Sequence, residues 1–83
     1  MVIDDAIADL TQRIRAVAPD AVVRTMRRSD TEAAMRVYAP ADLADALGAA
    51  TADLTVALLT SDGIDVQVLI YDITTSLPPE PEL

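Results

Sequence analysis

Apolar residues along this chain switch between the spacing of a helix and the spacing of a strand, and the order of these switches limits the possible folds. Residues 4–18 and 41–61 repeat apolar side chains every three or four positions, as one face of a helix requires. Residues 21–28, 32–39 and 64–71 instead alternate with the period of two that is typical of strands. The pattern therefore predicts the order α-β-β-α-β.

Proline and glycine mark the ends of these elements. We expect Asp4 or Asp5 to cap the first helix and Pro19 to end it, because proline disfavours helical geometry at the residue before it. Gly63 should end the second helix as a left-handed cap. Gly48 lies inside that helix, where a glycine costs about 1 kcal/mol relative to alanine, so a kink there is an open alternative.

The two adjacent strands predict a hairpin with a turn at residues 28–31. Central turn residues Ser29 and Asp30 set Arg27 opposite Glu32, Met26 opposite Ala33, Arg24 opposite Met35 and Val22 opposite Val37. The core face is then Val22, Met26, Ala33, Met35 and Val37, with Arg24 as its one misfit; the other face is Val23, Thr25, Arg27, Ala34, Arg36 and Tyr38. A longer loop would shift the register and exchange the two faces.

The third strand follows a helix, so it should return parallel to its neighbour by a right-handed crossover. This arrangement predicts an α+β fold, a two-layer sandwich in which a three-stranded mixed sheet carries both helices on one face. We assign residues 1–73 to this single domain and residues 74–83 to a Pro-rich, acidic and disordered tail. One sheet face and both edges are left uncovered, and a chain of 83 residues is small for a stable monomer.

The composition excludes several classes of function. The chain has no Cys and no His, so it lacks a thiol nucleophile, the usual zinc sites and a Ser-His-Asp triad. Acidic pairs such as Asp42 with Asp45, or Asp62 with Asp65, are better explained as solvated helix and turn residues than as metal or acid–base sites. We therefore predict no enzymatic activity, no catalytic residues, no metal site and no cofactor.

The net charge of −8 repels nucleic acid, and the two tyrosines are the only aromatic residues available for stacking on bases. No apolar run approaches the roughly 20 residues that span a bilayer, and the first residues do not resemble a signal peptide. We expect a cytoplasmic protein with no nucleic-acid partner and no membrane span.

All six basic residues are arginines, and all lie between residues 13 and 36. Four of them fall on the predicted hairpin and form a candidate site for an anion or an acidic partner: Arg24, Arg27, Arg28 and Arg36. The simpler interpretation, which we favour, is that they pair with the protein's own acids, such as Asp30 and Glu32.

A second candidate surface is the uncovered sheet face. Its predicted contact residues are Val23, Tyr38, Leu69 and Tyr71, since tyrosine and aliphatic side chains on an open sheet are typical of protein interfaces. These observations favour a non-enzymatic interaction module that forms a homodimer or higher homo-oligomer through the uncovered face or edge, with a further protein partner possible. The alternative is a small-ligand or anion sensor that uses the Arg-rich hairpin.

The element order, with a basic hairpin and an acidic long helix, is similar in outline to the cytoplasmic dimerisation domains of cation-efflux transporters. It also resembles BON-type and KH-like modules over about residues 4–72. The chain lacks the histidine metal ligands of the efflux domains and the Gly-x-x-Gly loop of KH-like RNA binders. The resemblance is therefore one of fold outline, which does not transfer function.

Overall fold

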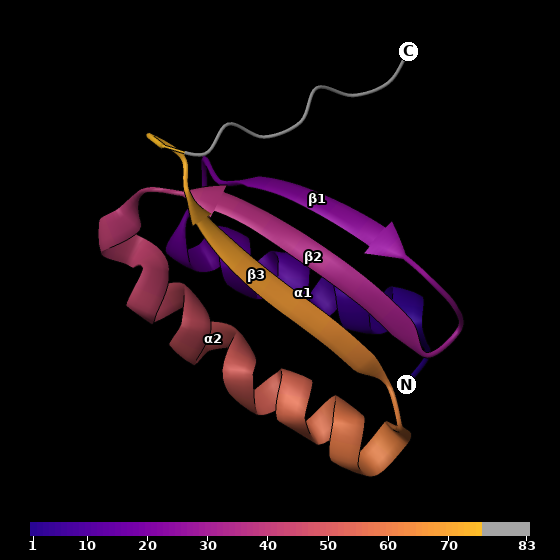
Figure 1. The fold of residues 1–83 in the computed structure, drawn as a ribbon. Helices are drawn as coiled ribbons and strands as arrows, with labels where there is room; N and C mark the ends of the chain where they lie inside the picture. Colours follow the sequence, from indigo (N-terminus) through magenta and orange to yellow (C-terminus); the bar gives the residue numbers. More distant parts are fainter. Residues whose placement is uncertain (76–83) are drawn as a thin grey trace.

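The computed structural model describes residues 1–75 and confirms the α+β fold (Figure 1). Its elements are α1 (Ile3–Val17), β1 (Val22–Arg27), β2 (Glu32–Ala39), a 3-10 turn η1 (Ala41–Leu43), α2 (Ala44–Ala57), a π-helical turn η2 (Leu58–Asp62) and β3 (Asp65–Asp72). The sheet order is β1-β2-β3, with β1 antiparallel and β3 parallel to the central β2. Both helices cover the same face of this sheet. Of the predicted tail 74–83, residues 76–83 lie outside the described residues, and Thr74 and Thr75 belong to a turn.

Helix α1 buries one stripe of side chains and keeps charges on the other side. Leu10 and Ile14 are fully buried, and burial of such a side chain is worth about 1.5–3 kcal/mol. The predicted capping role of Asp4 or Asp5 is wrong, because Val2 occupies the N-cap position and no side chain caps the helix. The two carboxylates lie instead in the first turn, where they still favour the helix dipole.

The predicted register of the hairpin is wrong by one residue. Arg27 pairs with Ala33, rather than with Glu32, and Arg24 pairs with Arg36. The loop is one residue longer than predicted because the Glu32 carbonyl accepts hydrogen bonds from the N–H groups of both Arg28 (2.9 Å) and Ser29 (3.2 Å). Glu32 then pairs only with β3, at Asp65.

This shift exchanges the two faces of β1. Val23 lies on the side of the helices and packs against the core, and Arg24 and Met26 lie on the opposite side with Ala34 and Arg36. The misfit of Arg24 in a core-facing row therefore came from the register.

The second helical stretch runs without a break from Ala41 to Asp62, close to the predicted range 41–61. It is irregular at its ends, in η1 and η2, and α-helical across Gly48, so Gly48 does not interrupt it. Gly63 has φ 65° and ψ 22°, the predicted left-handed cap, and the next residue, Ile64, donates its N–H to the Leu58 carbonyl at 3.1 Å.

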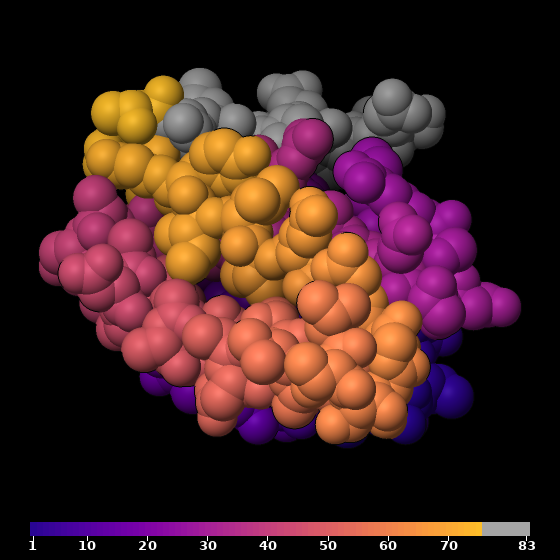
Figure 2. All heavy atoms as spheres, turned by 60° about the horizontal axis from the view of Figure 1, so that its bottom comes forward, coloured from indigo at the N-terminus to yellow at the C-terminus, as the bar shows by residue number. Residues whose placement is uncertain are grey.

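The outer side of this helical stretch stays exposed and partly apolar. Figure 2 shows α2 across the front of the molecule beside β3, and Val56 and Leu59 remain more than half exposed. By length and composition alone, Ala41–Asp62 could cross a membrane, with 17% of its most apolar window buried. Core helices of soluble proteins meet the same criterion, so the absence of a membrane span stays a prediction.

The core lies between the sheet and the helices. Its largest fully buried side chains are Leu10, Ile14, Met35, Val37, Leu47 and Leu58. From β3, Val66 is buried, and Val68 and Ile70 pack against the same cluster, as the alternation predicted. Every side chain on the other side of the sheet is therefore outside this core.

The two glycines should respond in opposite ways to replacement by alanine. Gly63→Ala should lower the free energy of unfolding by about 1 kcal/mol, because a left-handed φ strains any residue with a Cβ. Gly48→Ala should raise it by roughly 0.5–1 kcal/mol, because the new Cβ meets no atom within 4 Å inside a regular helix. Urea unfolding of both variants measures the difference; shifts of the same sign would contradict it.

Candidate binding surface on the open sheet face

The sheet face that α1 and α2 do not cover, here called the open face, is defined by alternate residues of the three strands. β1 contributes Val22, Arg24 and Met26, β2 contributes Glu32, Ala34, Arg36 and Tyr38, and β3 contributes Asp65, Gln67, Leu69 and Tyr71. The register sets them in rows across the sheet, so that Arg24, Arg36 and Leu69 form the central row. The open face thus has an aromatic end and an arginine-rich end.

The aromatic end is built from two stacked tyrosines. Tyr38 and Tyr71 are register partners on neighbouring parallel strands, and their rings stack with centroids 5.2 Å apart and an angle of 20° between planes. Tyr38 is 5% exposed and Tyr71 is half-buried. The pair presents one aromatic surface at the end of the sheet where β3 finishes.

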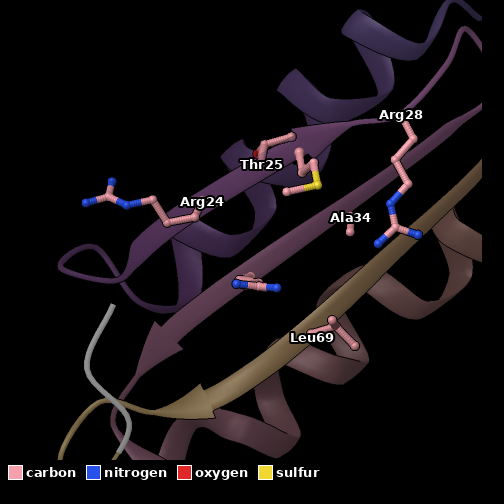
Figure 3. Close-up of a pocket in the computed structure, with 7 residues that line it drawn as sticks. Arg24, Thr25, Arg28, Ala34 and Leu69 are labelled. Carbon is pink, nitrogen blue, oxygen red and sulfur yellow. The ribbon is translucent and has the colours of Figure 1, made fainter. Parts of the chain in front are cut away.

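The arginine-rich end holds a shallow pocket of about 160 Å³. It is lined by Arg24, Thr25, Met26, Arg28, Ala34, Arg36 and Leu69. In Figure 3 the Arg28 side chain reaches across the sheet above Ala34, while Arg24 points outward from β1. Met26 and Leu69 expose 58% and 39% of their surface beside these cations. Apolar and cationic groups therefore share one concave surface.

The predicted cluster of four arginines is divided by the corrected register. Arg24, Arg28 and Arg36 line the pocket, whereas Arg27 lies on the helix side of β1. There its guanidinium contacts Asp4 at 3.1 Å and Asp30 at 2.8 Å. Arg27 thus joins the hairpin to the first turn of α1, and it does not line the pocket with the other three arginines.

The predicted interface set is divided in the same way. Tyr38, Leu69 and Tyr71 share the open face, but Val23 packs against the core on the opposite side. Sequence reasoning missed Met26, which it placed in the core face. The strict alternation of β1 and β2 could have identified Met26 as exposed, given the correct loop length.

The arginines also differ in their ion pairs. Arg13 pairs with Asp9 at 3.1 Å and with Asp53 at 3.9 Å, and Arg27 pairs with two aspartates. Within residues 1–75, neither Arg28 nor Arg36 forms an ion pair. Pairing with the protein's own acids, which the sequence favoured, therefore holds for Arg27 and does not hold for these two.

The acidic residues do not gather into a chemical site in the described part of the chain. Among residues 1–75, no three carboxylates are placed so that they could hold a metal ion. One carboxyl is perturbed: hydrogen bonds from the hydroxyl and the N–H of Thr74 hold the pKa of Asp72 below its ordinary value. This carboxylate shapes the turn that follows β3.

No protein-family model, curated protein or solved structure matches the chain. The likeness in outline to efflux dimerisation domains, BON-type modules and KH-like modules thus rests on element order alone. The function must be inferred from the open face itself.

Arg27 and Arg36 should contribute differently to stability. Arg27→Gln should lower the free energy of unfolding by about 0.5–1 kcal/mol, since it removes two exposed ion pairs. The matched substitution Arg36→Gln should change it by less than about 0.5 kcal/mol. Urea unfolding at low and high salt measures both, and only the Arg27→Gln effect should shrink with salt. A larger loss for Arg36→Gln would show a structural role for that residue.

Proposed function

We propose that this protein is a small, non-enzymatic interaction module that self-associates through its open face. The carrying observation is that Met26, Leu69 and the tyrosine pair lie together on the sheet face that neither helix covers. Clustered aromatic and aliphatic side chains are the usual anchors of protein interfaces. A second sheet packed on this face would bury Met26, Leu69 and the exposed part of Tyr71, and would add a third layer to the fold.

The charges of the open face support pairing between copies. If the two-fold axis of a face-to-face dimer runs along the strands, β1 of each copy lies over β3 of the other. Arg28 would then face Asp65 of the partner copy, because both lie in the row of Glu32. The proposed arrangement is therefore complementary in charge at its outer corners.

Association through the sheet edge is less favourable. The free edge strand β1 carries Arg24 and Arg27, with Arg28 directly after it. Antiparallel pairing of two such strands would bring arginines of both copies together, and like charges in paired strands are destabilising. We therefore prefer the face to the β1 edge.

Substitutions on the open face should weaken self-association. Leu69→Asp and Tyr71→Asp should each lower the association constant at least about fivefold, because loss of an interface anchor costs more than about 1 kcal/mol. Sedimentation equilibrium from low micromolar to sub-millimolar protein measures the constant. The matched control is Val56→Asp, which charges a more exposed apolar position on α2.

Two results would contradict this proposal. A wild-type chain that stays monomeric at every concentration excludes self-association. Dissociation by Val56→Asp, but not by Leu69→Asp, would place the contact on α2 instead.

Binding of a small anion is the second candidate function. One observation favours it: Arg28 and Arg36 line the same pocket and have no ion pair within residues 1–75. In the face-to-face dimer the two Arg36 side chains would also lie close to the axis, where a bound anion would offset their repulsion.

A thermal-shift series at constant ionic strength tests this second function. A phosphate or dicarboxylate that binds should raise the melting temperature. The stabilisation of the folded state should reach about 2.7 kcal/mol when the free anion is in hundredfold excess over its dissociation constant. Arg28→Gln with Arg36→Gln should abolish the gain, while Arg27→Gln, whose side chain lies on the other face, should retain it. If the anion raises the melting temperature equally in the wild type, the double variant and Arg27→Gln, its effect is a general one of ionic strength and the second function is contradicted.

A further inference from the structure

The described chain ends in a tight turn just beyond β3, at the end of the sheet that carries Tyr71. After β3, Ile73 donates its N–H to the Ala39 carbonyl at 3.0 Å, and Thr75 donates its N–H to the Asp72 carbonyl at 3.2 Å. The second bond closes a four-residue turn over Asp72–Thr75.

The Asp72 carboxylate holds this turn by accepting hydrogen bonds from the N–H and hydroxyl of Thr74, at 2.9 and 2.7 Å. Because these bonds lower the pKa of Asp72, they are fully present at neutral pH. They are lost only when the pH falls through the lowered pKa. Thr75, the last described residue, therefore lies at the end of the sheet that carries Tyr38 and Tyr71.

The sequence that follows is opposite in charge to the arginine-lined pocket of the open face. Residues 76–83, outside the described part, read Ser-Leu-Pro-Pro-Glu-Pro-Glu-Leu and contain no basic residue. Eight residues in extended, proline-rich form span roughly 25 Å at 3.1 Å per residue. The six residue steps from Tyr38 back to Glu32 cover about 20 Å of strand, so the segment is long enough to run the length of the face.

The order of residues along the segment also matches the order of groups along the face. Moving away from Thr75, the prolines Pro78 and Pro79 come before Glu80 and Glu82. Moving away from the same point on the sheet, the tyrosine pair comes before the arginines. Proline-rich segments bind aromatic surfaces, and guanidinium groups bind carboxylates, so both halves find complementary chemistry.

We propose that residues 76–83 bind the open face of their own molecule, with the prolines on Tyr38 and Tyr71 and the two glutamates at the arginine-lined pocket. This inference rests on the proposed function in one respect: the segment occupies the surface that a second copy would use. It acts as a built-in competitor of self-association, and removal of its charges should strengthen the dimer.

A spin label at the end of the chain tests this contact in the full-length protein. The chain has no Cys, so Leu83→Cys accepts a single nitroxide. The amides of Met26 and Arg28 should broaden strongly in NMR spectra, and that of Leu59 should not. The hairpin residues Met26 and Arg28 and the helical residue Leu59 all lie at the end of the domain remote from Thr75, where the Asp65 N–H donates to the Thr31 carbonyl. The hairpin belongs to the sheet layer and Leu59 to the helix layer (Figure 1).

Charge variants show whether the proposed groups make the contact. Glu80→Gln with Glu82→Gln, placed in the Leu83→Cys chain, should remove the broadening at Arg28, and so should Arg36→Gln. The matched control is Asp42→Asn with Asp45→Asn, which removes the same charge from the first turns of the second helical stretch. Broadening that survives the loss of both glutamates, or that is equal at Leu59 and Arg28, would overturn the proposal.

A mixed sample separates binding within one molecule from exchange between copies. Isotope-labelled chains without nitroxide, mixed with nitroxide-bearing chains without isotope, should show little broadening. Broadening that appears only in this mixture would overturn the intramolecular contact.

Sedimentation of the Glu80→Gln and Glu82→Gln chain gives an independent readout, with severalfold stronger association expected. If every chain is monomeric, the proposed self-association fails while the label still decides the contact of residues 76–83. If the wild type dimerises but the nitroxide on Leu83→Cys does not broaden the Arg28 amide signal of the same molecule, this inference fails and the proposed self-association stands.

Discussion

Two hydrogen bonds to the carbonyl oxygen of Glu32 set the register of the hairpin, and the chemistry of both sheet faces depends on that register. The donors are the N–H groups of Arg28 and Ser29, so the loop takes one residue more than a tight turn would. Because successive strand residues point to opposite faces, that single residue decides whether Val23 or Arg24 faces the helices. With Val23 inside, the core beneath the sheet is closed by apolar side chains, and Arg24 is left to the other side.

The helices can cover only one side of this sheet. A right-handed crossover carries α2 from β2 to the parallel neighbour β3, and α1 packs beside α2 in the same layer. The sheet is thus stabilised by the core on its helix side, and no helix covers its other side. The side chains of the open face are not needed to fill the core, which is why this face can hold arginine, methionine and tyrosine together.

The charges are divided between structural and exposed uses. Arg27 and Arg13 are bound by aspartates of the protein and tie elements together across its surface. Arg28 and Arg36 face outward from a chain whose net charge is −8, so the local potential differs in sign from the overall one. The partners that we propose for such a surface are an acidic peptide segment or a complementary copy of the chain, and the absence of a nucleic-acid partner stays a prediction from the net charge.

The sequence by itself determined the element order and the buried side of β3, because both follow from local periodicity. It determined the left-handed cap at Gly63 through local backbone geometry. The handedness of the crossover then fixed the mixed sheet with both helices on one face. It also brought Tyr38, Leu69 and Tyr71 to one surface. The hairpin register was not determined, since Val23-Thr25-Arg27 and Val22-Arg24-Met26 are similarly amphipathic sets and the loop length chooses between them. Only the tertiary structure decided that Arg27 binds Asp4, 23 residues away, while Arg28 and Arg36 line the open pocket. The reason is that side-chain direction in a strand follows from pairing, and pairing is a property of two segments rather than of one.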